Sequence, residues 1–286
     1  MPVSQSASPK IFRTSAELRR QIAEWRRDSG TVGLVPTMGG LHAGHLALVD
    51  AVQALASHSV VSIFVNPTQF AANEDLDTYP KNEQADVDML AAHNVGAVFA
   101  PPADEIYPAD FATTISVAGP GTGLETDFRP HFFSGVATVV AKLLLACSPD
   151  FSIFGEKDYQ QLVVIRRMVA DLGIDTKIVG HPTIRETDGL AMSSRNTYLS
   201  PSDRQIAPML NRILVQTADN ISSGTNIPEV LGHAKLTLGA AGFNVDYFEL
   251  RNAETLAPID DVEKEPLRLL AAAWLGKTRL IDNIPL

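Results

Sequence analysis

Cysteine is almost absent from this chain, because Cys147 is the single thiol among 286 residues. One thiol excludes an internal disulfide framework and any metal site made of several thiolates. Cys147 ends an apolar run with helical spacing, and a free cysteine in such a run is usually buried. The sequence therefore predicts a structural thiol rather than a redox or metal-binding one.

Long apolar stretches and basic clusters are absent too. No run approaches the ~20 apolar residues that a membrane-spanning helix needs, and residues 1–10 lack the apolar core of a signal peptide and predict a disordered tail. The net charge is −10, and the basic pairs Arg19-Arg20 and Arg26-Arg27 are not extended into longer clusters. These features disfavour a nucleic-acid or membrane partner and favour a cytoplasmic protein, although a local basic site can still bind an anion.

Three common phosphate-binding or catalytic motifs are missing. No G-x-G-x-x-G opens a helix, which disfavours a dinucleotide-binding fingerprint. Gly276-Lys277-Thr278 imitates the end of a P-loop, but Ala271 stands at the required earlier glycine and no helix is predicted after it. No G-x-S-x-G turn is present, which disfavours a serine hydrolase of the α/β type.

A glycine-rich turn is prominent among the features that are present. Residues 31–35 are rich in β-branched side chains and predict a buried strand, and residues 46–55 have apolar positions at helical spacing. Between them lie three glycines and the histidines His42 and His45. A strand that passes through such a turn into a helix presents free backbone N–H groups and a positive dipole end to an anion, most often phosphate. The two histidines share one face of the helix start and lack the spacing and the glutamate of a zinc-binding pair.

Strands alternate with helices from residue 11 to residue 184, and Ser15 is the expected cap of the first helix. Such alternation predicts an α/β fold with a Rossmann-like parallel sheet and right-handed crossovers. The pattern changes after this point. Residues 185–286 predict a smaller α+β C-terminal domain, with a long helix from Pro201, a second helix and three strand-like runs.

Polar residues follow two further predicted strands. The strand at residues 59–65 ends at Asn66, and the strand at residues 151–154 runs into Gly155-Glu156-Lys157-Asp158. Polar side chains past the carboxyl ends of buried strands are typical of sites in open α/β sheets. We interpret Lys157 as a phosphate contact rather than a solvated charge, and Asp158 as an acceptor for sugar hydroxyls or a helix cap. Further along, Met192-Ser193-Ser194-Arg195 supplies two hydroxyls and a guanidinium that suit a triphosphate.

These segments together resemble a known family. His42-Ala43-Gly44-His45 resembles the His-x-Gly-His motif of the nucleotidyltransferases related to class I tRNA synthetases, and Met192 to Arg195 resembles their Lys-Met-Ser-Lys-Ser-type motif. More narrowly, the chain is similar to the pantothenate synthetase (pantoate–β-alanine ligase) family from about residue 11 to the C-terminus. That similarity rests on PTMGGLHAGH, FVNPTQF, YP at 79–80, IFGEKDYQQL and PTIRETDGLAMSSRNTYLS.

The resemblance implies an ATP-dependent ligase that joins pantoate to β-alanine in coenzyme A precursor biosynthesis. The carboxylate of pantoate would attack the α-phosphorus of ATP to give pantoyl adenylate and pyrophosphate, and the amine of β-alanine would then release AMP. The resemblance also implies Mg²⁺ beside ATP, a cytoplasmic homodimer, and a C-terminal domain that closes over the ATP site. No covalent protein nucleophile is required.

The resemblance assigns roles residue by residue. The residues implied to hold ATP are Met38, Gly39, Gly40, Leu41, His42, Ala43, Gly44, His45, Gly155, Glu156, Lys157, Asp158, Ile184 (through its backbone, against adenine), Met192, Ser193, Ser194 and Arg195. Among them the implied catalytic residues are His42, His45 as a proton donor, Lys157 and Arg195. The implied substrate-binding residues are Asn66, Gln69, Tyr79, Arg129 and Gln161, with Gln69 and Gln161 on pantoate and Gln69 also on β-alanine. Asp86 is the implied carboxylate beside Mg²⁺, although the neighbouring Ala85 is often acidic in the family.

One segment departs from the family pattern. The family usually has Arg-Pro-x-His-Phe-x-Gly-Val, whereas here Arg129-Pro130 is followed by His131, Phe132 and Phe133. The histidine has moved one position earlier and a phenylalanine occupies its place. Either a local shift restores the contact of the histidine, or that histidine is dispensable.

Two other functions stay open at this point. A nucleotidyltransferase that transfers AMP to a phosphorylated vitamin precursor would use the same ATP motifs, but the neutral amides of Gln69 and Gln161 suit pantoate hydroxyls better than a second phosphate. A non-catalytic nucleotide-binding module would not require both histidines, Lys157 and Arg195 together.

Overall fold

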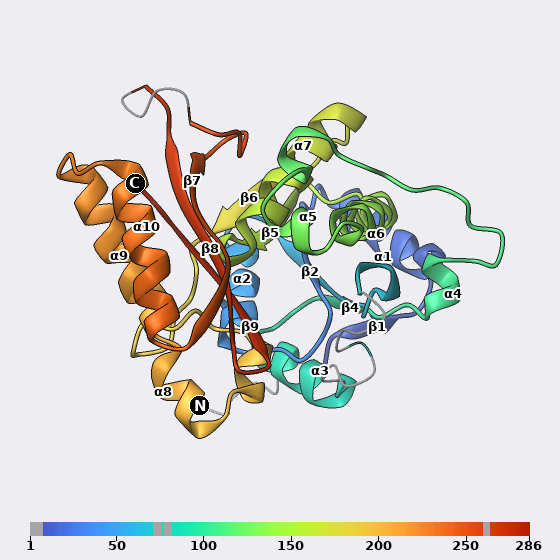
Figure 1. Ribbon diagram of the computed structural model, residues 1–286. Helices are drawn as coiled ribbons and strands as arrows, with labels where there is room; N and C mark the ends of the chain where they lie inside the picture. Colours follow the sequence, from blue (N-terminus) through green and yellow to red (C-terminus); the bar gives the residue numbers. More distant parts are fainter. Residues whose placement is uncertain (1–7, 71–75, 77–81, 260–263) are drawn as a thin grey trace. The chain divides into compact units, whose positions relative to one another are not determined.

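The computed structural model describes residues 8–70, 76, 82–259 and 264–286 (Figure 1). The chain divides into two compact units. The first unit comprises Met1–Val117, Arg129–Glu156 and Val164–His181, and the second comprises Ala118–Phe128, Lys157–Val163 and Pro182–Leu286. The second unit therefore takes in two short segments from the middle of the chain as well as its C-terminal part.

The first unit is built on a parallel sheet, which confirms the predicted Rossmann-like α/β class. Among the described residues the sheet has six strands in the order β1-β4-β3-β2-β5-β6, and all neighbouring strands are parallel. The strands are β1 (Lys10–Phe12), β2 (Val32–Thr37), β3 (His58–Ile63), β4 (Ala97–Phe99), β5 (Phe151–Gly155) and β6 (Lys177–His181). Lys10 already belongs to β1, so the predicted tail at residues 1–10 ends earlier than expected; residues 1–7 lie outside the described residues.

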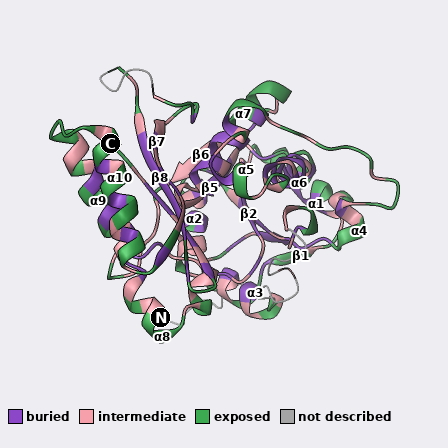
Figure 2. Ribbon diagram, in the orientation of Figure 1, coloured by how far each residue is buried: buried purple, intermediate pink, exposed green. Residues whose placement is uncertain are grey.

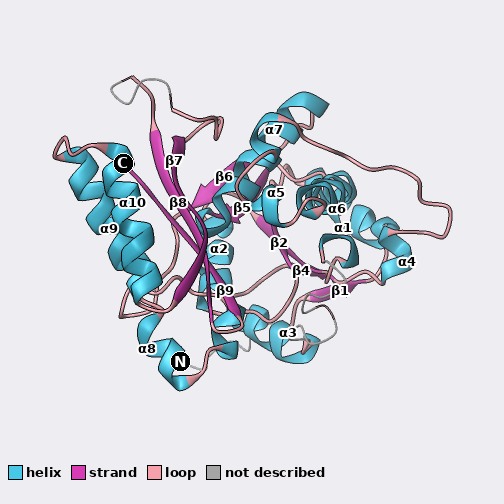
Figure 3. Ribbon diagram, in the orientation of Figure 1, coloured by secondary structure: helices cyan, strands magenta, loops and turns pink. Residues whose placement is uncertain are grey.

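Helices follow the strands and pack against the sheet (Figure 3). The helices of this part of the chain are α1 (Ser15–Arg27), α2 (Ala43–Gln53), α3 (Glu83–Ala92), α4 (Ala103–Ile106), α5 (Glu125–Phe128), α6 (Phe132–Cys147) and α7 (Tyr159–Leu172). Helix α2 contacts β2, β3 and β5, while α1 packs against α6. Gly33 permits the close approach of α2, because a Cβ at this position would lie 2.2 Å from Cγ2 of Val52. The four inner strands, β2 to β5, are mostly buried, as expected of a parallel sheet covered by helices, whereas the edge strands β1 and β6 are exposed or partly buried.

Two local predictions in this unit have clear outcomes. The predicted cap Ser15 is wrong by one residue, because the hydroxyl of Thr14 accepts a hydrogen bond from the backbone N–H of Glu17 and the Glu17 carboxylate accepts one from the N–H of Thr14. This reciprocal pair is a capping box. The predicted structural thiol is confirmed, since Cys147 is buried and burial raises its pKa to about 12.

The second unit contains a separate antiparallel sheet, as the α+β prediction requires. Its strands are β7 (Phe243–Asn252), β8 (Leu267–Leu275) and β9 (Thr278–Pro285), in that order. Helices α9 (Met209–Ser222) and α10 (Ile227–Ala240) pack together and against this sheet. Figure 2 shows that the central strand β8 is buried along most of its length.

The predicted single long helix from Pro201 is wrong. The chain forms α8 (Pro201–Ile206) and then α9, with Pro208 at the N-cap position of the second helix. Proline has no N–H to donate within a helix, so the first helix ends before it and a new one begins after it.

The order of the parallel strands places a switch point between β2 and β5, where successive crossovers leave in opposite directions. In open α/β sheets, ligands bind outside the carboxyl ends of the strands at such a point. The segment that follows β2 is the glycine-rich turn with His42 and His45, and the segment that follows β5 begins with Glu156. The sheet therefore brings two of the predicted site segments to one edge of the first unit.

Within the described residues, no helix is both long enough and apolar enough to cross a membrane.

Candidate active site

The turn after β2 is shaped by two glycines in left-handed conformations. Gly39 has φ +80° and Gly40 has φ +63°, values at which a side chain would be strained. The backbone N–H of Gly39 donates to Oγ1 of Thr37 at 3.2 Å, and the Thr37 hydroxyl donates to the carbonyl of Ser62 on β3 at 2.6 Å. Thr37 thus ties the start of the turn to the neighbouring strand.

Asp86 on α3 holds the rest of the turn. Its Oδ2 accepts the backbone N–H of Gly40 at 2.9 Å, and its Oδ1 accepts the N–H of Leu41 at 2.8 Å. The side chain is buried, with 2% of its residue surface exposed. The N–H groups of Gly39, Gly40 and Leu41 thus have acceptors within the protein, whereas the sequence predicts free donors in this turn.

The same geometry bears on the implied magnesium role of Asp86. Both of its carboxylate oxygens accept backbone N–H groups. Among the described residues, no group of three or more histidine, cysteine or acidic side chains is arranged to hold a metal ion. Asp86 fits a role in shaping the turn better than a role as a metal ligand.

His42 and His45 face each other at the start of α2, with ring centroids 4.1 Å apart. Nδ1 of His42 accepts the backbone N–H of Gly44 at 3.1 Å, and Nδ1 of His45 accepts the N–H of His42 at 3.3 Å. Because a backbone N–H can only donate, each neutral imidazole carries its proton on Nε2. Both rings lie at the N-terminal, positive end of α2, a location that suits an anionic ligand.

Asn66 and Gln69 lie together after β3, where the sequence predicts them. Asn66 is 1% exposed, and its Oδ1 accepts the hydroxyls of Thr68 and Tyr107, each at 2.9 Å. Its Nδ2 donates to the carbonyl of Gly135 and to Oε1 of Gln69, each at 3.1 Å. Asn66 is thus enclosed by the protein, and its side-chain amide contacts Gln69.

The amide of Gln69 is oriented by these contacts. Because its Oε1 is taken by Asn66, its Nε2 is directed to the other side, where it lies 2.9 Å from Sδ of Met38. Gln69 therefore offers N–H donors beside a residue of the glycine-rich turn. Gly135 permits this arrangement, since a Cβ there would lie 2.6 Å from the carbonyl oxygen of Thr68.

Arg129 also reaches this group, which places it with Gln69 as the sequence implies. It donates from Nη2 to the carbonyl of Gln69 at 3.1 Å, and its guanidinium lies 3.8 Å from the centre of the Phe132 ring. His131 is exposed at the N-cap position of α6. The phenylalanine in the family's histidine position therefore packs against Arg129, and the histidine itself lies at the surface. Tyr79 lies outside the described residues.

Among the remaining predicted residues, Gly155 and Glu156 belong to the first unit, and the others belong to the second. Lys157 lies 3.8 Å from the carboxylate of Asp158, with 20% of its side chain exposed, and Gln161 is half-buried in the first turn of α7. Ile184 and Met192 are joined directly, because the N–H of Met192 donates to the carbonyl of Ile184 at 2.9 Å. Residues 184–192 therefore form a hairpin that leads into the Ser193 cap, whose Oγ accepts the N–H of Arg195 at 3.3 Å.

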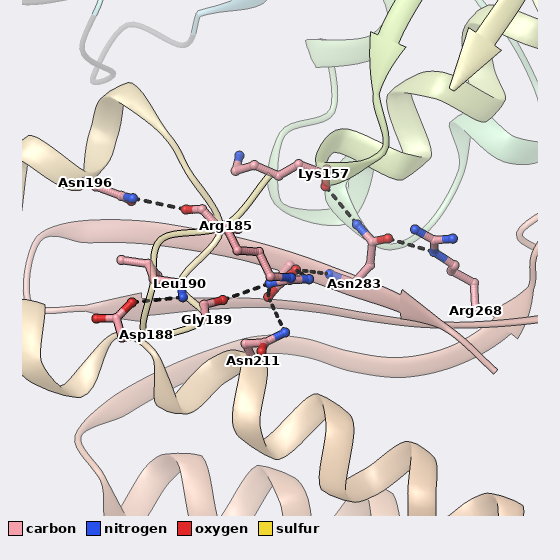
Figure 4. A network of polar contacts seen from close by, with 11 residues as sticks. Lys157, Arg185, Asp188, Gly189, Leu190, Asn196, Asn211, Arg268 and Asn283 are labelled. Atoms are coloured by element: carbon pink, nitrogen blue, oxygen red, sulfur yellow. Dashed lines mark hydrogen bonds and ion pairs between the residues drawn. The ribbon is translucent and has the colours of Figure 1, made fainter. Parts of the chain in front are cut away.

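Figure 4 shows polar residues that surround this hairpin and that sequence reasoning missed. Arg185 donates to both oxygens of Asp282, at 2.7 and 2.9 Å, and Asn283 donates to the carbonyl of Lys157 at 2.9 Å. The signal available in the sequence was a polar pair, Asp282-Asn283, inside an otherwise apolar strand. Tyr107, Thr37 and the turn-shaping role of Asp86 had no comparable signal, because their partners are distant in the chain.

The fold and the paired histidines define a class: a Rossmann-like α/β protein with imidazole donors at the switch point of its sheet. Comparison with known proteins narrows this class. The family described as pantoate-beta-alanine ligase matches residues 10–285. The chain belongs to the pantoate–β-alanine ligase family of enzymes.

Individual relatives support the same family membership. The pantothenate synthetase of Rhodopseudomonas palustris strain HaA2 is 53% identical over 277 residues, which cover 96% of this chain and 98% of the relative. The crystal structure of pantothenate synthetase from Thermus thermophilus is 44% identical, with a TM-score of 0.90 over 96% of this chain and 98% of that one. The pantoate-beta-alanine ligase of Francisella tularensis, crystallised with beta-gamma ATP and beta-alanine, is 35% identical, with a TM-score of 0.79 and 97% of each chain covered.

Proposed function

We propose that this protein joins pantoate to β-alanine in an ATP-dependent reaction that forms pantothenate. The observation that carries the proposal is the pair of imidazoles, His42 and His45, whose Nδ1 atoms accept backbone N–H groups. Both rings lie at the positive end of α2, where phosphate oxygens are bound favourably. Family membership supports the same reaction, and the Francisella tularensis relative was crystallised with an ATP compound and β-alanine.

In the proposed first step, a carboxylate oxygen of pantoate bonds to the α-phosphorus of ATP, and the bond to pyrophosphate breaks. Negative charge builds up on the departing pyrophosphate, and positioned donors and cations are the main catalytic resource for such a step. We assign this role to His42, His45, Lys157 and Arg195, with His45 as a proton donor. The remaining ATP contacts are assigned to residues 38–45, 155–158 and 192–195 and to the backbone of Ile184.

In the proposed second step, the amine of β-alanine attacks the acyl carbon of pantoyl adenylate, loses a proton and releases AMP. Gln69 and Gln161 bind the pantoate hydroxyls, and the outward N–H donors of Gln69 also meet β-alanine. Asn66 orients Gln69 rather than touching substrate, and Arg129 holds the Gln69 main chain. Tyr79 remains a proposed substrate contact on the family resemblance alone.

Mg²⁺ is proposed to arrive as a counter-ion of the ATP phosphates, because Mg²⁺ in such sites takes much of its coordination from phosphate and water. The described acidic residues do not fit a resident magnesium site, and Asp86 is engaged by two backbone N–H groups. We therefore assign no step to the ion. We further propose a cytoplasmic homodimer with a C-terminal domain that closes on bound ATP; a monomer in sedimentation at working concentration would contradict the dimer.

The deciding experiment is exchange of labelled pyrophosphate into ATP. Exchange should require pantoate and should proceed without β-alanine, because only the first step is reversed. Exchange without pantoate, or none with it, would contradict the proposal. A preference for a mononucleotide acceptor would instead favour AMP transfer to a phosphorylated precursor, and ATP binding without turnover on any acid and amine would favour a binding module.

A further inference from the structure

Two consecutive polar residues interrupt the last strand of the second unit. Asp282 and Asn283 are 4% and 3% exposed, in a strand whose neighbours are mostly apolar. Consecutive residues of a strand point to opposite faces of the sheet. One short segment of β9 can therefore contact two different parts of the second unit, as Figure 4 shows.

Asn283 holds the main chain of Lys157. Its Nδ2 donates to the Lys157 carbonyl at 2.9 Å, while its Oδ1 accepts Nε of Arg268 at 2.7 Å. The guanidinium of Arg268 lies 3.9 Å from the centre of the Tyr159 ring, two residues beyond Lys157. A carbonyl can only accept and a guanidinium can only donate, so the orientation of the Asn283 amide is determined. The Lys157 side chain extends away from this contact (Figure 4).

Asp282 holds the hairpin on the other face. It accepts Nη1 and Nη2 of Arg185, and its Oδ2 also lies 3.3 Å from Nδ2 of Asn211 on α9. Arg185 in turn donates to the carbonyl of Gly189 at 3.1 Å, across the hairpin that continues into Met192. The two parallel hydrogen bonds to the buried Asp282 fix the orientation of the Arg185 guanidinium as well as its distance from the carboxylate. The N–H of Asn283 donates to Oδ1 of Asp282 at 2.7 Å, which links the two anchors.

We propose that Asp282 and Asn283 are positioning residues for the nucleotide. They hold the Lys157 main chain and the start of the Met192–Arg195 segment in one rigid frame, so that a cation from each segment is already placed when ATP binds. The inference rests on the proposed function, which assigns Lys157 and Arg195 to the ATP phosphates. Neither Asp282 nor Asn283 touches substrate in this account.

A purely structural role for the pair would also explain their burial, so the test must separate the two roles. Asn283→Asp keeps the acceptor for Arg268 and replaces the donor to Lys157 by an oxygen, which repels the Lys157 carbonyl. Asn226→Asp is the matched control, because Asn226 is an exposed N-cap of α10 where aspartate caps equally well. Melting temperature, the exchange rate, the KM for ATP and the KM for β-alanine are measured for each protein.

Asn283→Asp should lower the pyrophosphate exchange rate about tenfold or more, since small misplacements of catalytic groups cost this much. The KM for β-alanine should stay within roughly twofold, as should every parameter of Asn226→Asp. Normal exchange in folded Asn283→Asp overturns the inference. A loss shared equally by all parameters and matched by a fall in melting temperature overturns it too.

A second arm asks whether Asn283 acts through Lys157. In a Lys157→Ala background, Asn283→Asp should cost little further exchange, because the positioned ammonium is already gone. Full additivity of the two losses contradicts the inference. Calorimetric titration with ATP alone provides a readout that does not depend on pantoate. Weaker ATP binding by Asn283→Asp supports positioning even if the wild type shows no exchange, whereas missing wild-type exchange counts against the proposed function only.

Discussion

Two turns of this protein are each held by a buried aspartate, yet the two carboxylates bind different groups. Asp86 accepts two backbone N–H groups of the turn after β2. Asp282 accepts the side chain of Arg185, which then reaches the hairpin that leads to Met192. The first turn is thus held directly through its main chain, and the second through one long side chain. A main-chain anchor leaves fewer rotatable bonds between the carboxylate and the turn than a side-chain anchor does.

The two kinds of anchor go with different groups that each turn could use to bind a ligand. The first turn uses its own N–H groups internally and presents the two imidazoles His42 and His45. The second turn presents hydroxyls and the Arg195 guanidinium on flexible side chains. The proposed function uses both turns for the same nucleotide, and each buried aspartate would hold its turn in place before the nucleotide binds.

The largest expected effect comes from removing the main-chain anchor with Asp86→Asn. The introduced amide offers one acceptor for two N–H groups, so we expect the free energy of unfolding to fall by about 2–3 kcal/mol. Pyrophosphate exchange should fall about 10²-fold, since the imidazoles move with the turn. The control is Asp88→Asn, an exposed carboxylate on the same helix that accepts from Gln84. Normal exchange in Asp86→Asn would show that the turn keeps its shape without the anchor.

An intermediate effect is expected from Arg185→Lys. An ammonium cannot bind both oxygens of Asp282 and also reach the carbonyl of Gly189. The variant therefore keeps an ion pair with Asp282 but no longer fixes the orientation of the hairpin. We expect the KM for ATP to rise about tenfold and the KM for pantoate to stay unchanged. Arg212→Lys, an exposed position on α9, serves as the control. A rise in the KM for pantoate alone would contradict the assignment of this hairpin to the nucleotide.

A smaller effect is expected from Tyr107→Phe, which removes one of the donors that fix Asn66 and hence Gln69. Thr68 still donates to Asn66, so the cost should be about 1 kcal/mol of stability and about a threefold to fivefold higher KM for pantoate. Burial raises the pKa of Tyr107 above its ordinary value of 10.0. The wild-type phenol therefore stays protonated and keeps donating its hydrogen bond in mildly alkaline solution. The KM of the wild-type protein for pantoate should not change in that pH range. An altered KM for ATP in the variant would contradict this role.

The smallest expected quantity is the coupling between the two anchors. Asp86→Asn and Arg185→Lys share no partner, so their free-energy effects on stability should add to within about 0.5 kcal/mol in the double variant. Chemical denaturation of the four proteins measures this term. A coupling of several times that size would mean that the two turns act as one unit.

The elements of the fold were largely predictable from local pattern. Strand β5 extends the strand predicted at residues 151–154 by one residue, and the three strand-like runs predicted after residue 185 correspond to β7, β8 and β9. The long helix from Pro201 was wrong because a proline at position 208 outweighed the helical spacing on either side. Periodicity therefore predicted where elements lie, and backbone chemistry decided where they end.

Of the candidate site, the sequence predicted only the residues that stand in recognisable motifs. The histidines, Lys157 and Gln69 stand in recognisable motifs next to strand ends, whereas Asp86 accepts N–H groups from residues 46 and 45 positions earlier. Nothing local to Asp86 distinguishes a turn anchor from a metal ligand, since the same carboxylate suits both. The acceptors of the backbone N–H groups in the turn were not predictable for the same reason.

The buried Cys147 has a practical consequence for labelling this protein at chosen sites. At 1% exposure and with a pKa raised to about 12, the single native thiol offers maleimide reagents almost no thiolate. The wild type thus behaves as a cysteine-free background. A reporter cysteine at an exposed position such as Leu236, which is 75% exposed on α10, would be labelled selectively without first replacing Cys147. With a second reporter in the parallel-sheet unit, fluorescence would test the proposed closure of the C-terminal domain on bound ATP.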